Sequence, residues 1–456
     1  MSFCLLKRKD GEEQPYWPFG PFKIRLPLIH YRWEPVEFVQ ALILFVVSLA
    51  MIPLLQKYLG LPYEVALAYV FVCGVGFMLP ALLGVPMVPG WITPAIPVVL
   101  LFISQYQPGP EAIKALMALQ ILVAVIFLGL GISKLSSKVV RRVPASIKAG
   151  ILLGAGVAAF MGEMKMGGRI PATPLAIGFG ALICFYMLFS VSFMRLRQRN
   201  AFCRILGKYG MVPAMLLSIA IGLLVKEYPL PDIQFGITIP QFAEMWNYLP
   251  LSVGFPEAEM FLQAIPTAII AYIIAFGDVI VGTTLVKDAV EETRPDEKVD
   301  VDSDRIHLVT GLRNVLHSFL APYPGLAGPI WTAVTATVAD RYRNGREAMD
   351  SIFSGSGTFW IAGFLALFAL PLVSFFKPFL PIGLSLTLVV TGYLCIITAF
   401  KQIESATQLG VAGTMAIVLA MHGAAWGLGT GVVLHILLER KMWSPVYTAR
   451  ETVRTK

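Results

Sequence analysis

The sequence predicts an all-α polytopic membrane protein whose fourteen transmembrane segments form two inverted repeats of seven. Three observations support this fold class: an apolar composition, a series of long apolar runs, and a PGxxxP motif that occurs once in each half of the chain. Of the 456 residues, 57% are hydrophobic and 14% are charged, whereas about a quarter of a soluble domain is charged. The mean hydropathy is +0.72. Because lipid cannot pair with backbone amides, and the runs do not alternate as barrel strands do, we expect the spans to be helices.

The apolar runs give the order of the segments. A full span takes about 20 helical residues, so some runs can only half cross the membrane. The third and tenth runs are the shortest, and both open with proline and glycine, which predicts half-helices at segments 3 and 10. The fourteen runs cover residues 38–58, 62–84, 92–104, 110–133, 143–161, 172–194, 210–226, 260–286, 305–320, 329–341, 350–372, 378–399, 404–421 and 422–438.

Basic residues in the short loops predict the orientation. They cluster at 134–142, 195–208 and 341–346, each time after an even-numbered segment, and again at both termini. Since Lys and Arg collect in cytosolic loops, both termini are predicted to lie in the cytosol, with the protein in the cytoplasmic (inner) membrane. The net charge of +8 therefore comes from loops, and we expect no nucleic-acid partner.

The longest charged connector, residues 287–305, contains eight acidic residues. Charge-rich loops are usually solvated, so we interpret this connector as a solvated hinge between the two halves. Seven segments precede it and seven follow it. An odd number of segments in each half places the second half in the opposite orientation.

The PGxxxP motif occurs at 89–94 and again at 324–329, 235 residues apart. Proline and glycine interrupt a helix and leave extended backbone before a new helix start, whose unpaired amides carry roughly half a positive charge. Two such starts facing each other form a polar site at the bilayer midplane. We therefore expect Trp91 and Gly328 to lie close together. The alternative is that each motif merely kinks an ordinary helix.

Short motifs recur in a fixed order: WITP at 91–94, VPAS at 143–146, FGD at 276–278, GLRN at 311–314 and ADRY at 339–342. In this order the chain resembles the nucleobase–cation symporter family of uracil and xanthine permeases over nearly all of residues 37–438. That family shares a seven-plus-seven fold with sulfate permeases and bicarbonate-type anion exchangers. The resemblance implies a core that carries the substrate, a gate, an elevator motion of core against gate, and a homodimer formed through the gate.

The resemblance also implies how the chain divides. A cytosolic arm at 1–36 and a cytosolic tail at 441–456 enclose the membrane domains. The core comprises residues 37–142 (segments 1–4) and 259–372 (segments 8–11). The gate comprises residues 143–258 (segments 5–7) and 373–440 (segments 12–14).

Two glutamates of the family are missing. The permeases carry one four residues before the position of Asp278, where this chain has Ile274, and another at the start of segment 10, where 325–339 contain no carboxylate. In the family these acids hold the nucleobase. Without them, two positive helix starts favour an anion, such as a carboxylate, sulfate or bicarbonate-like solute.

The candidate substrate contacts come mainly from the two motifs. Thr93 offers a hydroxyl, Trp91 offers an apolar wall with one N–H donor, and glycines allow backbone amides to approach the solute. Segment 8 contributes Tyr272. The predicted substrate-binding residues are Gly90, Trp91, Ile92, Thr93, Tyr272, Ile274, Gly325, Ala327, Gly328, Trp331 and Thr332.

Asp278 is the only carboxylate well inside a predicted span. An ionisable residue at that depth is costly and is by default a functional candidate. We interpret Asp278 as the site of a coupling proton or sodium ion. The alternative is a structural anchor that binds the half-helix amides.

These features predict a secondary active transporter for a small polar solute, an anion or a nucleobase-like compound, coupled to a proton or sodium ion. An anion exchanger and a passive uniporter or channel are the alternatives. An enzyme is disfavoured because the spans contain no metal-ligand pair, Ser–His–Asp set or nucleotide-binding glycine loop. We expect no cofactor and no metal; the expected partners are the solute, the coupling ion and membrane lipid.

Overall fold

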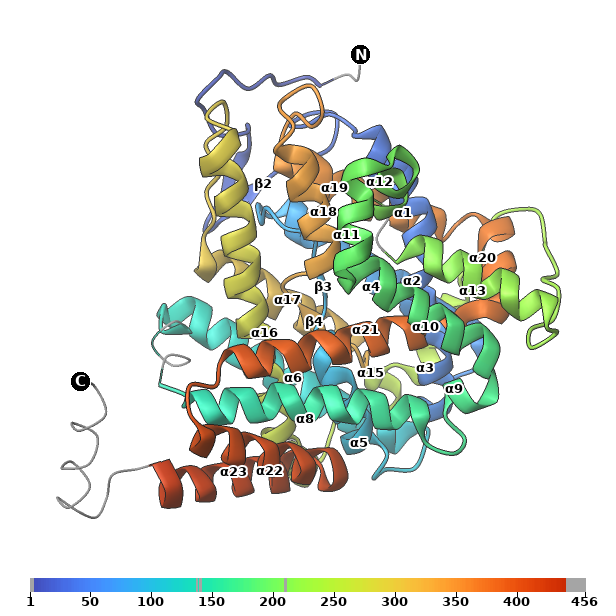
Figure 1. Ribbon diagram of the computed structural model, residues 1–456, viewed down its shortest axis with the longest axis vertical. Helices are drawn as coiled ribbons and strands as arrows, with labels where there is room; N and C mark the ends of the chain where they lie inside the picture. Colours follow the sequence, from blue (N-terminus) through green and yellow to red (C-terminus); the bar gives the residue numbers. More distant parts are fainter. Residues whose placement is uncertain (1–3, 137, 139–141, 209–210, 440–456) are drawn as a thin grey trace.

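The computed structural model describes residues 4–136, 138, 142–208 and 211–439, so the tail expected at 441–456 lies outside the described residues. The chain is mostly helical (Figure 1). The helices before the connector are α1 (Pro35–Leu44), α2 (Val46–Leu49), α3 (Ile52–Leu59), α4 (Tyr63–Leu82), α5 (Ile96–Ile103), α6 (Pro110–Ser133), α8 (Ala145–Met164), α9 (Arg169–Ala172), α10 (Pro174–Phe189), α11 (Val191–Arg199), α12 (Ala201–Lys208), α13 (Val212–Leu224), α14 (Phe242–Met245), α15 (Pro250–Val253) and α16 (Ala258–Thr293).

The helices after the connector are α17 (Ser303–Leu320), α18 (Thr332–Tyr342), α19 (Ile352–Ala366), α20 (Leu370–Phe376), α21 (Leu380–Lys401), α22 (Ala406–His422) and α23 (Ala424–Leu434). Short helical turns are η1 (Thr93–Ala95), η2 (Trp246–Tyr248), η3 (Lys377–Phe379) and η4 (His435–Glu439). The short strands form two antiparallel pairs: a hairpin of β1 (Trp17–Phe19) with β2 (Phe22–Ile24), and a long-range pair of β3 (Gly90–Trp91) with β4 (Ala327–Gly328).

Five described helical stretches are long and apolar enough to cross a membrane, or seven when each of two bent helix pairs is counted as one span. The five are Tyr63–Leu82, Pro110–Ser133, Ala145–Ala172, Ala258–Glu291 and Leu370–Lys401. Shorter apolar helices, such as Thr93–Ile103 and Ile352–Ala366, fall within other predicted segments. The multi-pass helical class is confirmed, whereas the count of fourteen spans stays a prediction.

The first predicted segment, 38–58, is not one continuous helix. It is divided into α1, α2 and α3, and α3 begins with Pro53 in its first turn. Proline has no N–H to continue a preceding helix, but it fits the first turn of a new one. Gly60 ends α3 in the left-handed conformation, with φ of 66°. The break brings Ser48 to the centre of the protein, where its carbonyl accepts a hydrogen bond from the Tyr323 hydroxyl.

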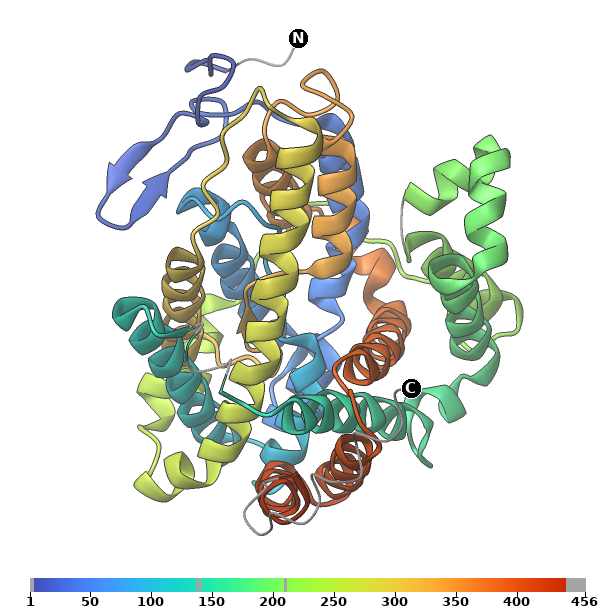
Figure 2. The same cartoon turned by 60° about the vertical axis from the view of Figure 1, so that its left-hand side comes forward.

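The helices form two groups. In the first, α17 packs on α6 and α4, α19 packs on α1, and α16 packs on α6 and α18. In the second, α8 packs on α21 and α22, and Figure 1 shows these three helices and α23 running side by side. Figure 2 shows α10 to α13, in green, at the edge of the molecule opposite the β1–β2 hairpin. The first group comes from the ranges predicted as core and the second from those predicted as gate; their relative motion stays a prediction.

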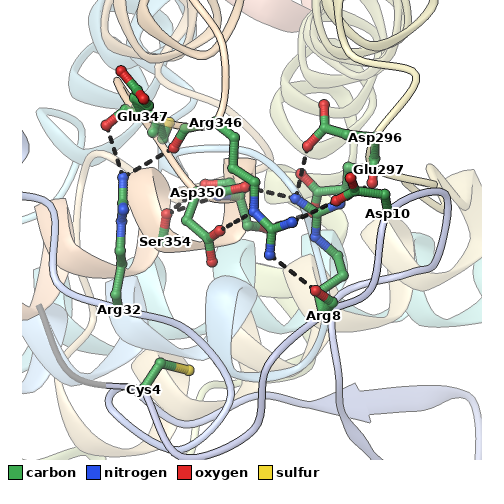
Figure 3. A network of polar contacts seen from close by, with 12 residues as sticks. Cys4, Arg8, Asp10, Arg32, Asp296, Glu297, Arg346, Glu347, Asp350 and Ser354 are labelled. Atoms are coloured by element: carbon green, nitrogen blue, oxygen red, sulfur yellow. Dashed lines mark hydrogen bonds and ion pairs between the residues drawn. The ribbon is translucent and has the colours of Figure 1, made fainter.

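The connector is not solvated as predicted, because ion pairs join it to the N-terminal arm (Figure 3). The Asp296 carboxylate accepts hydrogen bonds from Arg294 at 2.7 Å and from Arg8 at 2.9 Å. Glu297 is only 2% exposed and accepts a hydrogen bond from the Tyr342 hydroxyl at 2.8 Å. The prediction of a solvated hinge is therefore wrong for the part around Asp296 and Glu297, whereas Asp288 and Glu291 are exposed as predicted. The compensating charges come from segments far away in the sequence, which the local charge pattern does not reveal.

Asp296→Asn is expected to destabilise the protein at neutral pH and to weaken its sensitivity to acid. The Arg294 and Arg8 guanidinium groups hold the pKa of Asp296 well below its ordinary value. A carboxylate with a lowered pKa stabilises the fold above its ordinary pKa of 3.8, and this stabilisation is lost as the pH falls further. Hydrogen bonds to charged groups contribute about 1.5–3 kcal/mol each.

Thermal unfolding of the purified protein between pH 7 and pH 3 measures this effect. The melting temperatures of wild type and Asp296→Asn should differ by a constant amount from pH 7 down to about pH 4, and the difference should begin to shrink as the pH falls to 3. Asp340→Asn is the matched control, because the Asp340 side chain is 73% exposed and its pair with Arg343 is an exposed one. A constant difference at every pH would show that the Asp296 charge does not act as described.

Candidate functional site

The two short strands β3 and β4, one from each PGxxxP motif, pair at the centre of the protein. We call this pair the crossing. Gly90 lies opposite Gly328, and Trp91 lies opposite Ala327. The Ile92 N–H donates to the carbonyl groups of Gly325 and Leu326, just before β4, at 3.0 and 3.2 Å. The prediction that Trp91 and Gly328 lie close together is therefore confirmed. The alternative, two ordinary kinked helices, is wrong, because each motif forms extended backbone followed by a new helix.

Glycine is required at both positions of the crossing. A Cβ atom on Gly90 would lie 2.7 Å from the Ile330 carbonyl oxygen, and one on Gly328 would lie 2.6 Å from the Trp91 carbonyl carbon. At Gly325, a Cβ would lie 2.7 Å from the Trp91 ring. These distances are too short for any side chain, so the two backbones can approach each other only with glycine.

A helix starts within a few residues of the end of each strand, without a capping side chain. The turn η1 begins after Ile92 and leads into α5, and α18 begins after Trp331; neither start receives a side-chain cap. The first amides of a helix have no partner within the helix, and they carry a partial positive charge. Thr335 ties the start of α18 to the other motif, because its hydroxyl lies 3.2 Å from both the N–H and the carbonyl of Val88.

A small cavity lies at these helix starts. Its volume is about 20 Å³, which is room for one or two water-sized groups, since a buried water needs about 10–15 Å³. The described residues around it include no carboxylate. They are Ser48, Phe77, Gly90, Trp91, Thr93, Trp331, Trp360 and Thr387.

Four of the eight lining residues are aromatic. Phe77 stacks on Trp360 with ring centroids 3.9 Å apart, and Trp331 lies 6.1 Å from the same indole. The Trp360 indole N–H donates to the Pro89 carbonyl at 3.0 Å. The hydroxyl groups of Ser48 and Thr93 have no hydrogen-bond partner in the described part of the chain. The cavity is thus apolar with two free hydroxyl groups, a combination typical of small-molecule sites.

Helix α17 supports the crossing with two buried polar side chains. Asn314 donates to the Ala327 carbonyl and accepts from the Ala327 N–H, both at 2.9 Å. Arg313 is fully buried and donates to the Gly328 carbonyl at 2.6 Å and to the Gly90 carbonyl at 3.2 Å. In the sequence, the two residues stand out only as part of the GLRN motif. The signal that could have identified Arg313 is an arginine inside an apolar segment, because a charge there is costly and is by default a functional candidate.

The predicted residues take different places relative to the cavity. Gly90, Trp91, Thr93 and Trp331 line it. The backbone of the crossing and the first turn of α18 are formed by Ile92, Gly325, Ala327, Gly328 and Thr332.

Segment 8 does not contribute to the cavity as predicted. The Tyr272 hydroxyl lies 3.2 Å from His307 Nε2, and its ring packs on Phe127 of α6, because this face of α16 points toward α6 and α17. Ile274 is buried without lining the cavity. Asp278 also lies outside the lining and makes no hydrogen bond or ion pair with any residue that the structure describes. It is close enough to Cys395 of α21 for an electrostatic interaction.

No protein-family model matches the sequence, and a search of curated proteins finds no match. Solved structures are similar in fold. The transmembrane domain of the cyanobacterial bicarbonate transporter BicA matches 87% of this chain and 96% of its own, with a TM-score of 0.55 and 16% identity. SLC26A9 matches 89% of this chain and 65% of its own, with a TM-score of 0.55 and 15% identity.

The murine anion transporter Slc26a9 in the inward-facing state matches 89% of this chain and 68% of its own, with 15% identity and a TM-score of 0.49. At such low identity the likeness to BicA and SLC26A9 concerns the fold. It confirms the predicted class of inverted-repeat membrane fold, while the exact count of seven spans in each half stays a prediction. It gives no support to the finer prediction of a uracil or xanthine permease.

Proposed function

We propose that the protein is a secondary transporter of a small anion. The observation that carries this proposal is the convergence of two uncapped helix starts on one small cavity whose described lining contains no carboxylate. Each start contributes roughly half a positive charge. The cavity field is therefore positive, which attracts an anion and repels a cation.

A nucleobase fits this site poorly. The positions of the two family glutamates, which would hold its ring nitrogens and amides, are occupied by Ile274 and by the carboxylate-free stretch 325–339. A compact anion needs only N–H and O–H donors, which the helix starts and the hydroxyl groups of Ser48 and Thr93 provide. The name printed for one structural neighbour, a bicarbonate transporter, agrees with this class of solute.

Transport proceeds by movement of core against gate. Most of the cavity lining belongs to the range predicted as core, and Thr387 of α21 belongs to the range predicted as gate. A solute at this boundary becomes exposed to either side when one group slides past the other, as in alternating access. Asp278 couples the movement to a proton or sodium ion, both termini are cytosolic, and two copies associate through the gate. An exchanger on the same fold would use the same site without the coupling ion.

Uptake into proteoliposomes of the purified full-length chain tests the proposal. We expect uptake of at least one of chloride, sulfate and bicarbonate above that of protein-free liposomes, and no uptake of uracil or xanthine. The matched control is Gly328→Leu, which fills the crossing at the cavity and should remove the signal. Uptake of a nucleobase in the absence of any anion uptake would overturn the proposed substrate class.

A further inference from the structure

We propose that Arg313 is the positioning residue that gives the cavity its preference for anions. This inference rests on the proposed function and extends it to a side chain that does not line the cavity. Arg313 acts in two ways: its charge lies one aromatic ring away from the solute, and its two amino groups hold the carbonyl groups of the crossing.

The position of the charge follows from the contacts of the guanidinium group. Its centre lies 4.9 Å from the ring centroid of Phe77, and the Phe77 ring lines the cavity. The side chain is fully buried, and its Nε atom has no hydrogen-bond partner in the described structure. The charge is thus held at a fixed place next to the cavity, where water does not screen it.

No described carboxylate pairs with Arg313. The ion pairs of the described acidic groups lie elsewhere, largely between the N-terminal arm and the connector. Asp278 forms no ion pair with any described residue. A buried charge without a counter-charge costs several kcal/mol. The two carbonyl dipoles offset part of this cost, and an anion in the cavity offsets more. A solute of negative charge is therefore the missing partner of this arginine.

The hydrogen bonds of Arg313 also shape the local field. Gly90 and Gly328 lie directly opposite each other in the crossing, and the planar guanidinium group binds both carbonyl oxygens at once. These oxygens carry partial negative charge, which would repel an anion if they faced the cavity. Their hydrogen bonds to the positively charged Arg313 offset this partial charge. Lysine preserves the charge but lacks the planar fork that binds two acceptors.

The competing explanation is that Arg313 only holds the crossing together and does not act on the solute. Transport kinetics distinguish this explanation from the proposed role. The probe is whichever of chloride, sulfate and bicarbonate the wild type takes up fastest. For Arg313→Gln we expect the KM to rise at least about tenfold, because a positive charge close to the solute is lost. For Arg313→Lys we expect a KM within about threefold of wild type and a lower maximal rate, since the charge remains while the fork is lost. A residue that only holds the crossing together would impair both variants equally and would leave the KM unchanged.

A second pair of variants keeps Arg313 in place. Cys73 is fully buried, interacts electrostatically with Arg313, and accepts a hydrogen bond from the Trp91 indole. Cys73→Asp should neutralise the arginine and raise the KM at least about tenfold relative to Cys73→Ser, because both variants lose the thiol and only one adds a charge.

Equal KM values for Cys73→Asp and Cys73→Ser, or equal KM values for wild type and Arg313→Gln, would overturn the role of Arg313 while leaving anion transport intact. Absence of anion uptake by the wild type would instead overturn the proposed function, and this inference with it. Arg195→Gln, an exposed arginine on α11, controls for a general loss of positive charge and should behave as wild type.

Discussion

Replacing Gly328 with alanine is expected to reduce transport strongly, although the change adds a single methyl group. The added Cβ would lie 2.6 Å from the Trp91 carbonyl carbon and 2.7 Å from the Ile92 nitrogen. Both are backbone atoms of the other half of the protein, so neither can rotate away. The two strands must separate, and both helix starts then move away from the cavity. Overpacking of this kind costs about 1–3 kcal/mol, which corresponds to roughly 5- to 150-fold in the population of the competent state.

Gly129→Ala is the matched control for this experiment. Gly129 lies on the exposed face of α6, where an added Cβ meets nothing within 4 Å. Alanine also favours the helix there by about 1 kcal/mol. Gly90→Ala should reproduce the loss, since a Cβ on Gly90 meets the Ile330 carbonyl oxygen at 2.7 Å. The crossing would not be the transport site if Gly328→Ala, reconstituted at the wild-type level, took up anions as fast as Gly129→Ala.

The crossing could be predicted from the sequence because its causes are local. Proline at 89 and 324, each followed by glycine, interrupts a helix whatever surrounds it, and the repeat of the motif in an inverted half implies that the two interruptions meet. The structure adds the register, with Gly90 opposite Gly328. Register depends on which backbone groups pair across the two halves, and the motif itself does not determine this.

The roles of Arg313 and Asn314 could not be predicted in the same way. The GLRN motif shows two polar residues in an apolar segment, but their partners are backbone groups of β3 and β4 that only the folded chain brings to α17. Tyr272 shows the opposite case, a residue that the sequence places at the substrate and that does not line the cavity. An apolar segment of continuous hydrophobicity does not reveal which face points toward the cavity, and the Tyr272 face of α16 turns toward α6 and His307.

The connector shows a third limit of prediction from the sequence. Its acidic residues predict solvation when only neighbours in the sequence are considered. In the folded protein, Arg8 of the arm and Arg294 of the connector itself neutralise Asp296, and Glu297 becomes buried. Charge patterning identifies how many charges a segment carries. Whether they face water depends on complementary charges from distant segments.

Asp278→Asn is expected to abolish gradient-driven uptake while the protein still folds and binds its solute. In the described structure the carboxylate has no hydrogen bond or ion pair, so the alternative of an anchor that binds the half-helix amides has no supporting contact. A charge inside a spanning helix without a partner is costly, and binding of a proton or sodium ion removes that cost. Asp278 also lies near Cys395, between the helix groups predicted as core and gate. Under the proposed movement of core against gate, neutralising the carboxylate by ion binding would lower the cost of moving it past α21.

The measurement compares two assays on the same proteoliposomes: anion uptake driven by an imposed proton or sodium gradient, and exchange of labelled for unlabelled anion without a gradient. In Asp278→Asn the first should fall to the level of protein-free liposomes, and the second should remain within about threefold of wild type, because the asparagine side chain keeps the shape and removes only the ionisable group. Asp340→Asn, with its 73% exposed side chain at the end of α18, should leave both assays unchanged. If Asp278→Asn still accumulates anion against a gradient, the coupling ion binds elsewhere. If exchange is lost together with driven uptake in a folded variant, Asp278 serves the movement of the core and not the coupling of the ion.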